Sequence, residues 1–163
     1  MNQFNEKMRA INAAIRDGDL ETVRANLNED EEALNTKVAL GTWLHTAASR
    51  GQLEIVKYLV ERGLSVNVRC DLSTQKPICK AVANEHSNVV EFLLSNGADI
   101  DTDTAVANPL FDAILENQIE IAKTLIATGM ETSIKYTSET LTNMSASDVA
   151  REYDRSEIVE LLT

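Results

Sequence analysis

Two histidines and two cysteines are the side chains of this sequence best suited to nucleophilic or metal chemistry. His45 and His86 lie about 41 residues apart, and Cys70 and Cys79 form no Cys-x-x-Cys motif. A structural zinc site needs four such ligands at narrowly defined spacings, so these residues do not predict one. Because no paired-cysteine framework is present, we expect both cysteines to be thiols.

Three aspartates, Asp99, Asp101 and Asp103, alternate in the way that begins a calcium-binding loop. Such a loop also needs glycine at its sixth position and glutamate at its twelfth. This chain has Thr104 and Leu110 there. The sequence also lacks phosphate-binding loops and nucleophile elbows. We therefore expect no catalytic residues, no metal site, no cofactor and no enzymatic activity.

The elements that position these side chains recur along the chain. Each of five segments has a short apolar stretch, a turn and a longer amphipathic stretch, which is the pattern of a helix–turn–helix unit. One alanine occupies the same place in every unit, and its spacings are 33, 34, 32 and 37 residues: Ala14, Ala47, Ala81, Ala113 and Ala150. A second column is aliphatic: Val23, Val56, Val90, Ala122 and Val159. A fixed period of about 33 residues predicts an all-α repeat protein.

The second unit shows which repeat this is. It reads Thr42-Trp43-Leu44-His45-Thr46-Ala47-Ala48, then Gly51-Gln52-Leu53-Glu54-Ile55-Val56, then Gly63-Leu64-Ser65-Val66-Asn67. This order resembles the ankyrin repeat, whose pattern is Thr-Pro-Leu-His-x-Ala-Ala, Gly-x-x-x-(Ile/Val)-Val and Gly-Ala-Asp-x-Asn. Trp43 replaces the usual proline. The resemblance implies that His45 bonds locally and tightens the turn, and that His86 occupies a structural position at the start of a helix.

The resemblance covers nearly the whole chain and implies an ankyrin-repeat solenoid with short hairpin-like finger loops between its helix pairs. We expect a single domain over residues 1–163, whose repeats span about 4–36, 37–70, 71–103, 104–139 and 140–163. The first and last repeats are expected to be caps.

Short-range signals predict where the helices begin and end. Asp19 is an expected N-cap, and Ser145-x-x-Asp148 resembles a capping box. Prolines stand at the expected first helical positions, and glycines at the expected stops: Pro77, Pro109, Gly63, Gly97 and Gly129. The charge run over residues 29–32 is expected to be a solvated helix end and loop, or alternatively a docking patch. An apolar finger is expected over residues 33–41.

Charge limits the class of partner. The chain carries 15 basic and 26 acidic residues, a net charge of −11. Residues 37–70 carry +3, so the second repeat is a basic island in an acidic body. Such a field repels nucleic acid and anionic lipid and favours a basic protein, although it also serves solubility. No apolar leader or 18-residue apolar run is present, so we expect a soluble cytoplasmic protein that is a monomer when free.

Stacked repeats bind partners through a concave face made of fingers and inner helices. The positions that vary in the family, together with Trp43 at the place of the usual proline, predict the binding residues here: Val38, Leu40, Trp43, Arg50, Leu72, Ser73, Asn84, Thr104, Val106, Glu116, Met144 and Tyr153. Trp43 has two interpretations. It either fills the core under its own finger or anchors the interface, where tryptophan is enriched.

These patterns predict a non-catalytic module that binds a protein partner and inhibits or regulates it. Three segments resemble stand-alone bacterial ankyrin proteins, some of which are similar to immunity proteins: residues 41–45, 108–111 and 135–139. By that analogy, the partner would be a basic toxin or nuclease. The alternative is a regulatory ankyrin protein, such as a kinase inhibitor or an adaptor.

Overall fold

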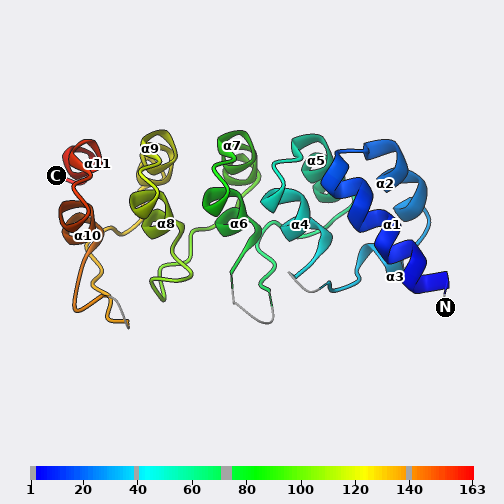
Figure 1. The fold of residues 1–163 in the computed structure, drawn as a ribbon, viewed down its shortest axis with the longest axis horizontal. Helices are drawn as coiled ribbons and strands as arrows, with labels where there is room; N and C mark the ends of the chain where they lie inside the picture. The colour runs from blue at the N-terminus through cyan, green and yellow to red at the C-terminus, as the bar shows by residue number, and fades with distance from the viewer. Residues whose placement is uncertain (1–2, 39–40, 71–74, 139–140) are drawn as a thin grey trace. The chain divides into compact units, whose positions relative to one another are not determined.

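The protein is all-α in a computed structural model that describes residues 3–38, 41–70, 75–138 and 141–163. These residues form eleven helices and no strand (Figure 1). The helices are α1 (Gln3–Asp17), α2 (Leu20–Leu27), α3 (Glu31–Leu34), α4 (Trp43–Ser49), α5 (Leu53–Glu61), α6 (Pro77–Ala83), α7 (Ser87–Ser95), α8 (Pro109–Leu115), α9 (Ile119–Ile126), α10 (Ala146–Glu152) and α11 (Ser156–Leu161).

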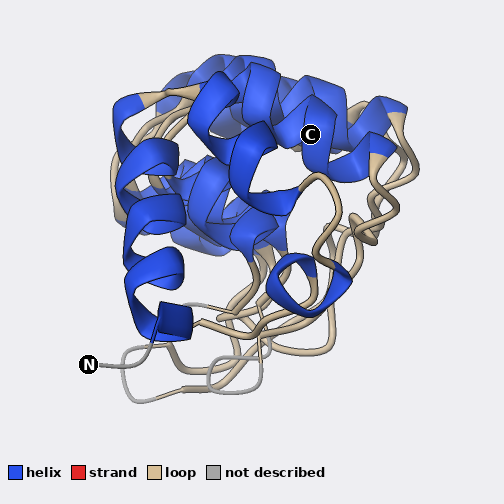
Figure 2. Cartoon of the chain, turned by 90° about the vertical axis from the view of Figure 1, so that its right-hand side faces the viewer, coloured by secondary structure: helices blue, strands red, loops and turns tan. Residues whose placement is uncertain are grey.

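The chain divides into two compact units, residues 1–98 (unit 1) and 99–163 (unit 2). In unit 1 the first, or inner, helices of the pairs pack side by side in the order α1, α4, α6, and the outer helices in the order α2, α5, α7. In unit 2, α8 packs on α10 and α9 on α11. The loops that join successive pairs leave the helices on one side in each unit (Figure 2). That all five pairs form one domain stays a prediction.

The two repeated columns lie at the helix contacts. All five alanines of the first column are buried, because a small side chain lets neighbouring helices approach closely. In the second column, the residues in the first four outer helices have no exposed surface. Val159 in α11 is half-buried. The core is therefore a strip of small and aliphatic side chains that runs between helix pairs within each unit.

The turn inside each pair uses one left-handed residue at the same place in the repeat. These residues have φ between 56° and 75°: Gly18, Gly51, Glu85, Asn117 and Asp154. The predicted caps are confirmed. The Asp19 carboxylate accepts from the backbone N–H of Thr22 at 3.0 Å. Ser145 N–H donates to Asp148 Oδ2 at 2.9 Å, and Asp148 N–H donates to Ser145 Oγ at 3.3 Å.

The charge run over residues 29–32 differs from its expected loop. Asp30 caps an additional helix, α3, by accepting from the N–H of Ala33 at 2.8 Å. Lys7 binds the same carboxylate at 2.6 Å, and Arg62 binds Glu31 at 2.8 Å. The expected finger therefore begins later than residue 33, because Ala33 and Leu34 are buried in α3.

Two of the connecting loops are hairpin-like, as predicted. Val38 and Gly41 exchange backbone hydrogen bonds of 2.7 and 2.9 Å. Tyr136 and Met144 exchange bonds of 2.9 and 3.0 Å. The loop over residues 99–108 is instead closed by a bond from Asn108 N–H to the Thr104 carbonyl at 3.1 Å. The fingers thus differ in length and geometry although the helix pairs repeat.

Candidate protein-interaction surface

His45 has the structural role that the sequence predicted. Its Nδ1 accepts from the backbone N–H of Thr42 at 3.1 Å, so its Nε2 carries the proton and donates to the Gln75 carbonyl at 3.1 Å. The ring is fully buried. Burial lowers the pKa of His45, and the nearby charge of Lys80 lowers it further. The neutral imidazole therefore ties the start of α4 to the next connecting loop.

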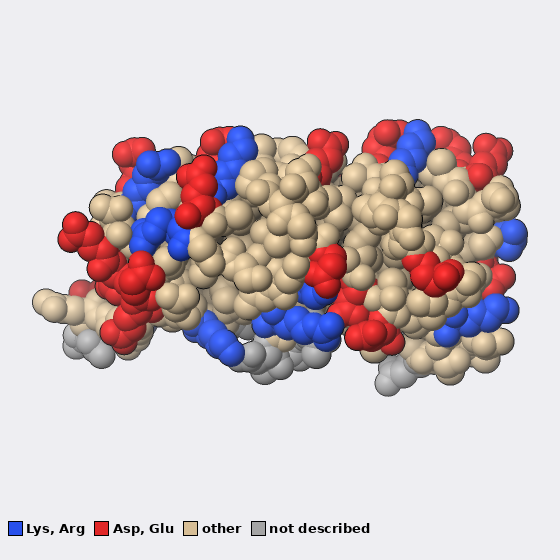
Figure 3. Space-filling model, turned by 180° about the vertical axis from the view of Figure 1, so that it is seen from behind, with Lys and Arg blue, Asp and Glu red and all other residues tan. Residues whose placement is uncertain are grey.

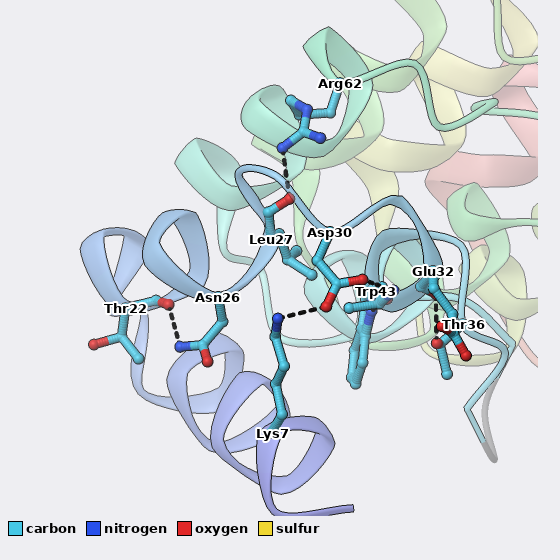
Figure 4. A network of polar contacts seen from close by, with 10 residues as sticks. Lys7, Thr22, Asn26, Leu27, Asp30, Glu32, Thr36, Trp43 and Arg62 are labelled. Carbon is cyan, nitrogen blue, oxygen red and sulfur yellow. Dashed lines mark hydrogen bonds and ion pairs between the residues drawn. The ribbon is translucent and has the colours of Figure 1, made fainter. Parts of the chain in front are cut away.

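Trp43 lies in the core. Its side chain has no exposed surface, and its Nε1 donates to the Ala33 carbonyl at 2.8 Å, beneath the polar contacts that hold α3 (Figure 4). The structure therefore supports the core interpretation of Trp43. Its assignment as an interface anchor is corrected, because a partner cannot reach a fully buried ring.

Arg62 shows that part of the basic island is used inside the fold. Its guanidinium donates to the Leu27 carbonyl and to the Tyr58 hydroxyl, each at 2.9 Å. Together with the Glu31 carboxylate, the Tyr58 contact raises the pKa of Arg62, and Tyr58 contributes most. Arg24 and Arg62 also lie 5.1 and 5.8 Å from the centre of the Tyr58 ring. These contacts stabilise unit 1, and they already engage the Arg62 guanidinium within the fold.

Four predicted residues share one position, the C-cap of an inner helix, and all four are exposed: Arg50, Asn84, Glu116 and Tyr153. In unit 1, Asn84 Nδ2 donates to Ser49 Oγ at 3.3 Å, next to Arg50. In unit 2, Glu116 and Tyr153 end α8 and α10, which pack together. We call these four residues the C-cap column.

The predicted finger residues are less uniform. Val106 is 65% exposed and Thr104 is exposed, whereas Val38 and Met144 are half-buried. Thr104 also has a local role, since its hydroxyl accepts from the N–H of Ala107 at 3.1 Å. Leu40, Leu72 and Ser73 lie outside the described residues. The predicted binding residues at the inner-helix ends are therefore all exposed, apart from the buried Trp43 at the start of α4, whereas only some of the described finger residues are.

Sequence reasoning missed the side chains that join neighbouring pairs. Each is the N-cap residue of an outer helix. Its side chain reaches the C-terminal end of the inner helix in the preceding helix pair. Gln52 donates to the Arg16 carbonyl at 3.3 Å, and His86 Nε2 lies 3.2 Å from the Ser49 carbonyl. In unit 2, Arg155 donates to the carbonyls of Ile114 and Leu115 at 3.2 and 2.7 Å. The constant offset of five residues from the repeated alanine could have revealed these contacts.

The described residues contain no cluster of three His, Cys, Asp or Glu side chains that could hold a metal ion. Cys70 and Cys79 are buried thiols. A hollow of about 260 Å³ in unit 2 is lined by Lys135, Ser147 and Asp148, among others. Asp148 is already committed there, since hydrogen bonds from Ser145 and the charges of Lys135 and Arg151 lower its pKa.

No helix within the described ranges combines the length and the apolar character needed to cross a membrane.

The repeats can now be compared with known families. The profile described as "Ankyrin repeats (3 copies)" matches residues 11–104 and 65–137. The chain belongs to the ankyrin repeat family. Ankyrin repeats generally mediate protein–protein interactions, through surfaces formed by adjacent repeats. The repeat prediction made from the alanine column is therefore confirmed.

The relatives of this ankyrin repeat protein are diverse. A putative ankyrin repeat protein of Rickettsia felis is 29% identical over 71% of this chain and 53% of its own length. Protein phosphatase 1 regulatory subunit 27 of Mus musculus is 32% identical over 67% of this chain and 73% of its own length. Alpha-latrocrustotoxin-Lt1a of Latrodectus tredecimguttatus is 32% identical over 46% of this chain and 5% of the toxin. The chain thus spans about half of the Rickettsia protein and a small part of the toxin.

Charge is distributed unequally between the units. Residues 99–163 carry 4 of the 15 basic and 13 of the 26 acidic side chains, a net charge of −9 that leaves −2 for residues 1–98. Figure 3 shows carboxylates and cations interspersed on one face. Most of the net negative charge of the chain therefore lies in unit 2.

Proposed function

We propose that this ankyrin repeat protein is a non-catalytic module that binds a protein partner and inhibits or regulates it through its inner-helix ends and fingers. The observation that carries the proposal is the C-cap column. Arg50, Glu116 and Tyr153 are exposed, and their side chains form no hydrogen bond or ion pair with the described residues. Side chains without a structural role, placed where ankyrin repeats bind, are best explained by a partner.

The more specific proposal is an immunity-type inhibitor of a basic toxin or nuclease. A net charge of −9 on unit 2 favours fast association with a basic protein and disfavours nucleic acid or an anionic membrane as the partner. Inhibition would follow if the acidic surface covered the nucleic-acid-binding face of the partner. A protein that is cytoplasmic, and a monomer until it meets its partner, suits this role.

A regulatory adaptor is the second candidate. It is favoured by the similarity to a protein named as a regulatory subunit of protein phosphatase 1, of which this chain covers 73%. This candidate predicts a partner that is an enzyme of signalling, such as a phosphatase or a kinase, and not a toxin.

Affinity capture from the native lysate, followed by mass spectrometry and an activity assay of the purified partner, tests these proposals. The immunity-type proposal expects a basic partner whose activity is lost in the complex. An acidic partner, or one that stays fully active when bound, would contradict it. A double variant, Arg50→Ala with Glu116→Ala, should weaken capture, whereas the matched variant Lys57→Ala with Glu54→Ala on the outer helix α5 should not.

A further inference from the structure

We propose that the ends of α8 and α10 in unit 2 form a docking surface for an arginine-bearing segment of a basic protein, with Tyr153 as the stacking platform. The surface consists of Glu116, Glu152 and Tyr153. This inference deepens the proposed function, on which it rests, because it names the side-chain chemistry that the partner presents.

Packing brings the three residues together. α8 and α10 are neighbours, and Arg155 donates from its guanidinium to the carbonyls of Ile114 and Leu115. Glu116 follows Leu115 directly, and Tyr153 precedes Arg155 by two positions. The Arg155 contact therefore holds the C-cap of α8 beside the C-cap of α10. Tyr153 is 43% exposed, and only Val106 is a more exposed large apolar side chain among the described residues.

Charge complementarity identifies the occupant. All four cations of unit 2 are already engaged. Lys123 binds Glu120 at 2.7 Å, while Lys135 and Arg151 lie 3.9 and 3.8 Å from Asp148. Arg155 is held by the two carbonyls. No cation of unit 2 thus neutralises Glu116 or Glu152, whose exposed carboxylates have no hydrogen bond or ion pair within the described residues.

An arginine fits this surface better than a lysine. Its planar guanidinium stacks on an aromatic face and can donate two parallel hydrogen bonds to a carboxylate, whereas an ammonium is a hydrated point charge. The same positions in the three inner helices of unit 1 carry a net charge of +1, from Arg16 and Asp17, Ser49 and Arg50, and Ala83 and Asn84. A basic segment is therefore expected to bind the inner-helix ends of unit 2 and not those of unit 1.

Fluorescence anisotropy with a labelled hexa-arginine peptide tests the surface. Tyr153→Ala leaves the net charge unchanged, so non-specific attraction cannot account for its effect. We expect Tyr153→Ala to weaken binding about 2- to 5-fold, the range of an exposed cation–π contact, and Tyr153→Phe to bind like the wild type. Hexa-lysine should bind more weakly than hexa-arginine. Equal binding by wild type and Tyr153→Ala, with both folded by circular dichroism, would overturn the proposal.

A matched pair of charge variants completes the test. Glu116→Gln and Glu160→Gln remove the same charge, but Glu160 is an exposed residue of the outer helix α11. We expect Glu116→Gln alone to weaken peptide binding, about 2- to 5-fold. Equal losses of affinity in the two variants would show that the peptide responds only to net charge, which would contradict the proposed surface. If a native partner binds the wild type and Tyr153→Ala equally well, the proposed surface is wrong but the proposed interaction function stands. If the wild type captures no partner, the result counts against the proposed function itself.

Discussion

The indole of Trp43 donates a 2.8 Å hydrogen bond to the carbonyl of Ala33, ten residues earlier in the chain. This bond joins the first turn of α4 to the short helix α3, which is also held by Lys7 of α1 and Arg62 at the end of α5. A ring at the position of the usual ankyrin proline thus closes the space between the first and second helix pairs. Its role is cohesion within unit 1.

Removing this ring should therefore lower the free energy of unfolding. We expect Trp43→Ala to cost about 3–5 kcal/mol, the range for a large aromatic removed from a packed core. Urea denaturation followed by far-ultraviolet circular dichroism measures the loss. Tyr153→Ala is the control, because that ring is 43% exposed and should cost far less. A Trp43→Ala protein as stable as the control would show that the indole is not part of the core.

Gly51 should tolerate no side chain, for two separable reasons. Its φ is +67°, and an added β-carbon would lie 2.5 Å from His86 Nδ1. Gly63 has φ +95° with no atom within 4 Å of an added β-carbon, so Gly63→Ala isolates the backbone cost of about 1–2 kcal/mol. We expect Gly51→Ala to lose at least about 1 kcal/mol more than that.

A double variant checks the cause of the extra loss. If the His86 ring is the obstacle, Gly51→Ala with His86→Ala should cost less than the sum of the two single changes. Additive losses in thermal denaturation would point to the backbone alone.

Stability should depend on the protonation of His45. The pKa of the buried ring lies below its ordinary value of about 6.5 because burial disfavours the imidazolium. The unfolded chain therefore binds the proton more readily, so stability should fall as pH drops below about 6.5 and level off below the folded pKa. We expect His45→Asn to be less stable at pH 7.5 and to lose this slope between pH 7.5 and 5.5. His86→Gln, compared by urea titration at each pH, should retain it.

The capping box at α10 should contribute measurably to the stability of unit 2. Ser145 Oγ accepts from Asp148 N–H, so Ser145→Ala removes that acceptor, and we expect a loss of about 1 kcal/mol. Ser156→Ala changes an exposed serine at the first position of α11 and should cost little. Equal effects of the two substitutions in urea melts would contradict the role of the box.

Sequence predicted the parts of the fold that depend on short-range signals. The start of α10 follows from two residues three positions apart, and the helix pairs follow from the repeated alanines. Helix α3 was missed because four residues are too short to show periodicity. Its supports, Lys7 on Asp30 and Arg62 on Glu31, come from 23 and 31 residues away. Such contacts cannot be read from a local pattern.

The candidate surface was predictable only in outline. Trp43, Val106 and Tyr153 are all large apolar residues predicted to bind a partner, yet Trp43 is fully buried while the other two are exposed. The difference for Trp43 depends on α3, which the sequence did not show. The importance of Glu152 depends on which cations of unit 2 are already engaged, and this is a property of the folded chain.

The close approach of Gly51 and His86 has a consequence for how this protein can change over time. The turn residue of the second repeat must be glycine because of the cap residue that the third repeat presents to it. The two repeats are therefore not interchangeable parts. An insertion, duplication or exchange of a repeat that separated this histidine from its glycine would place a bulky cap against the wrong turn, so the pair should be inherited together.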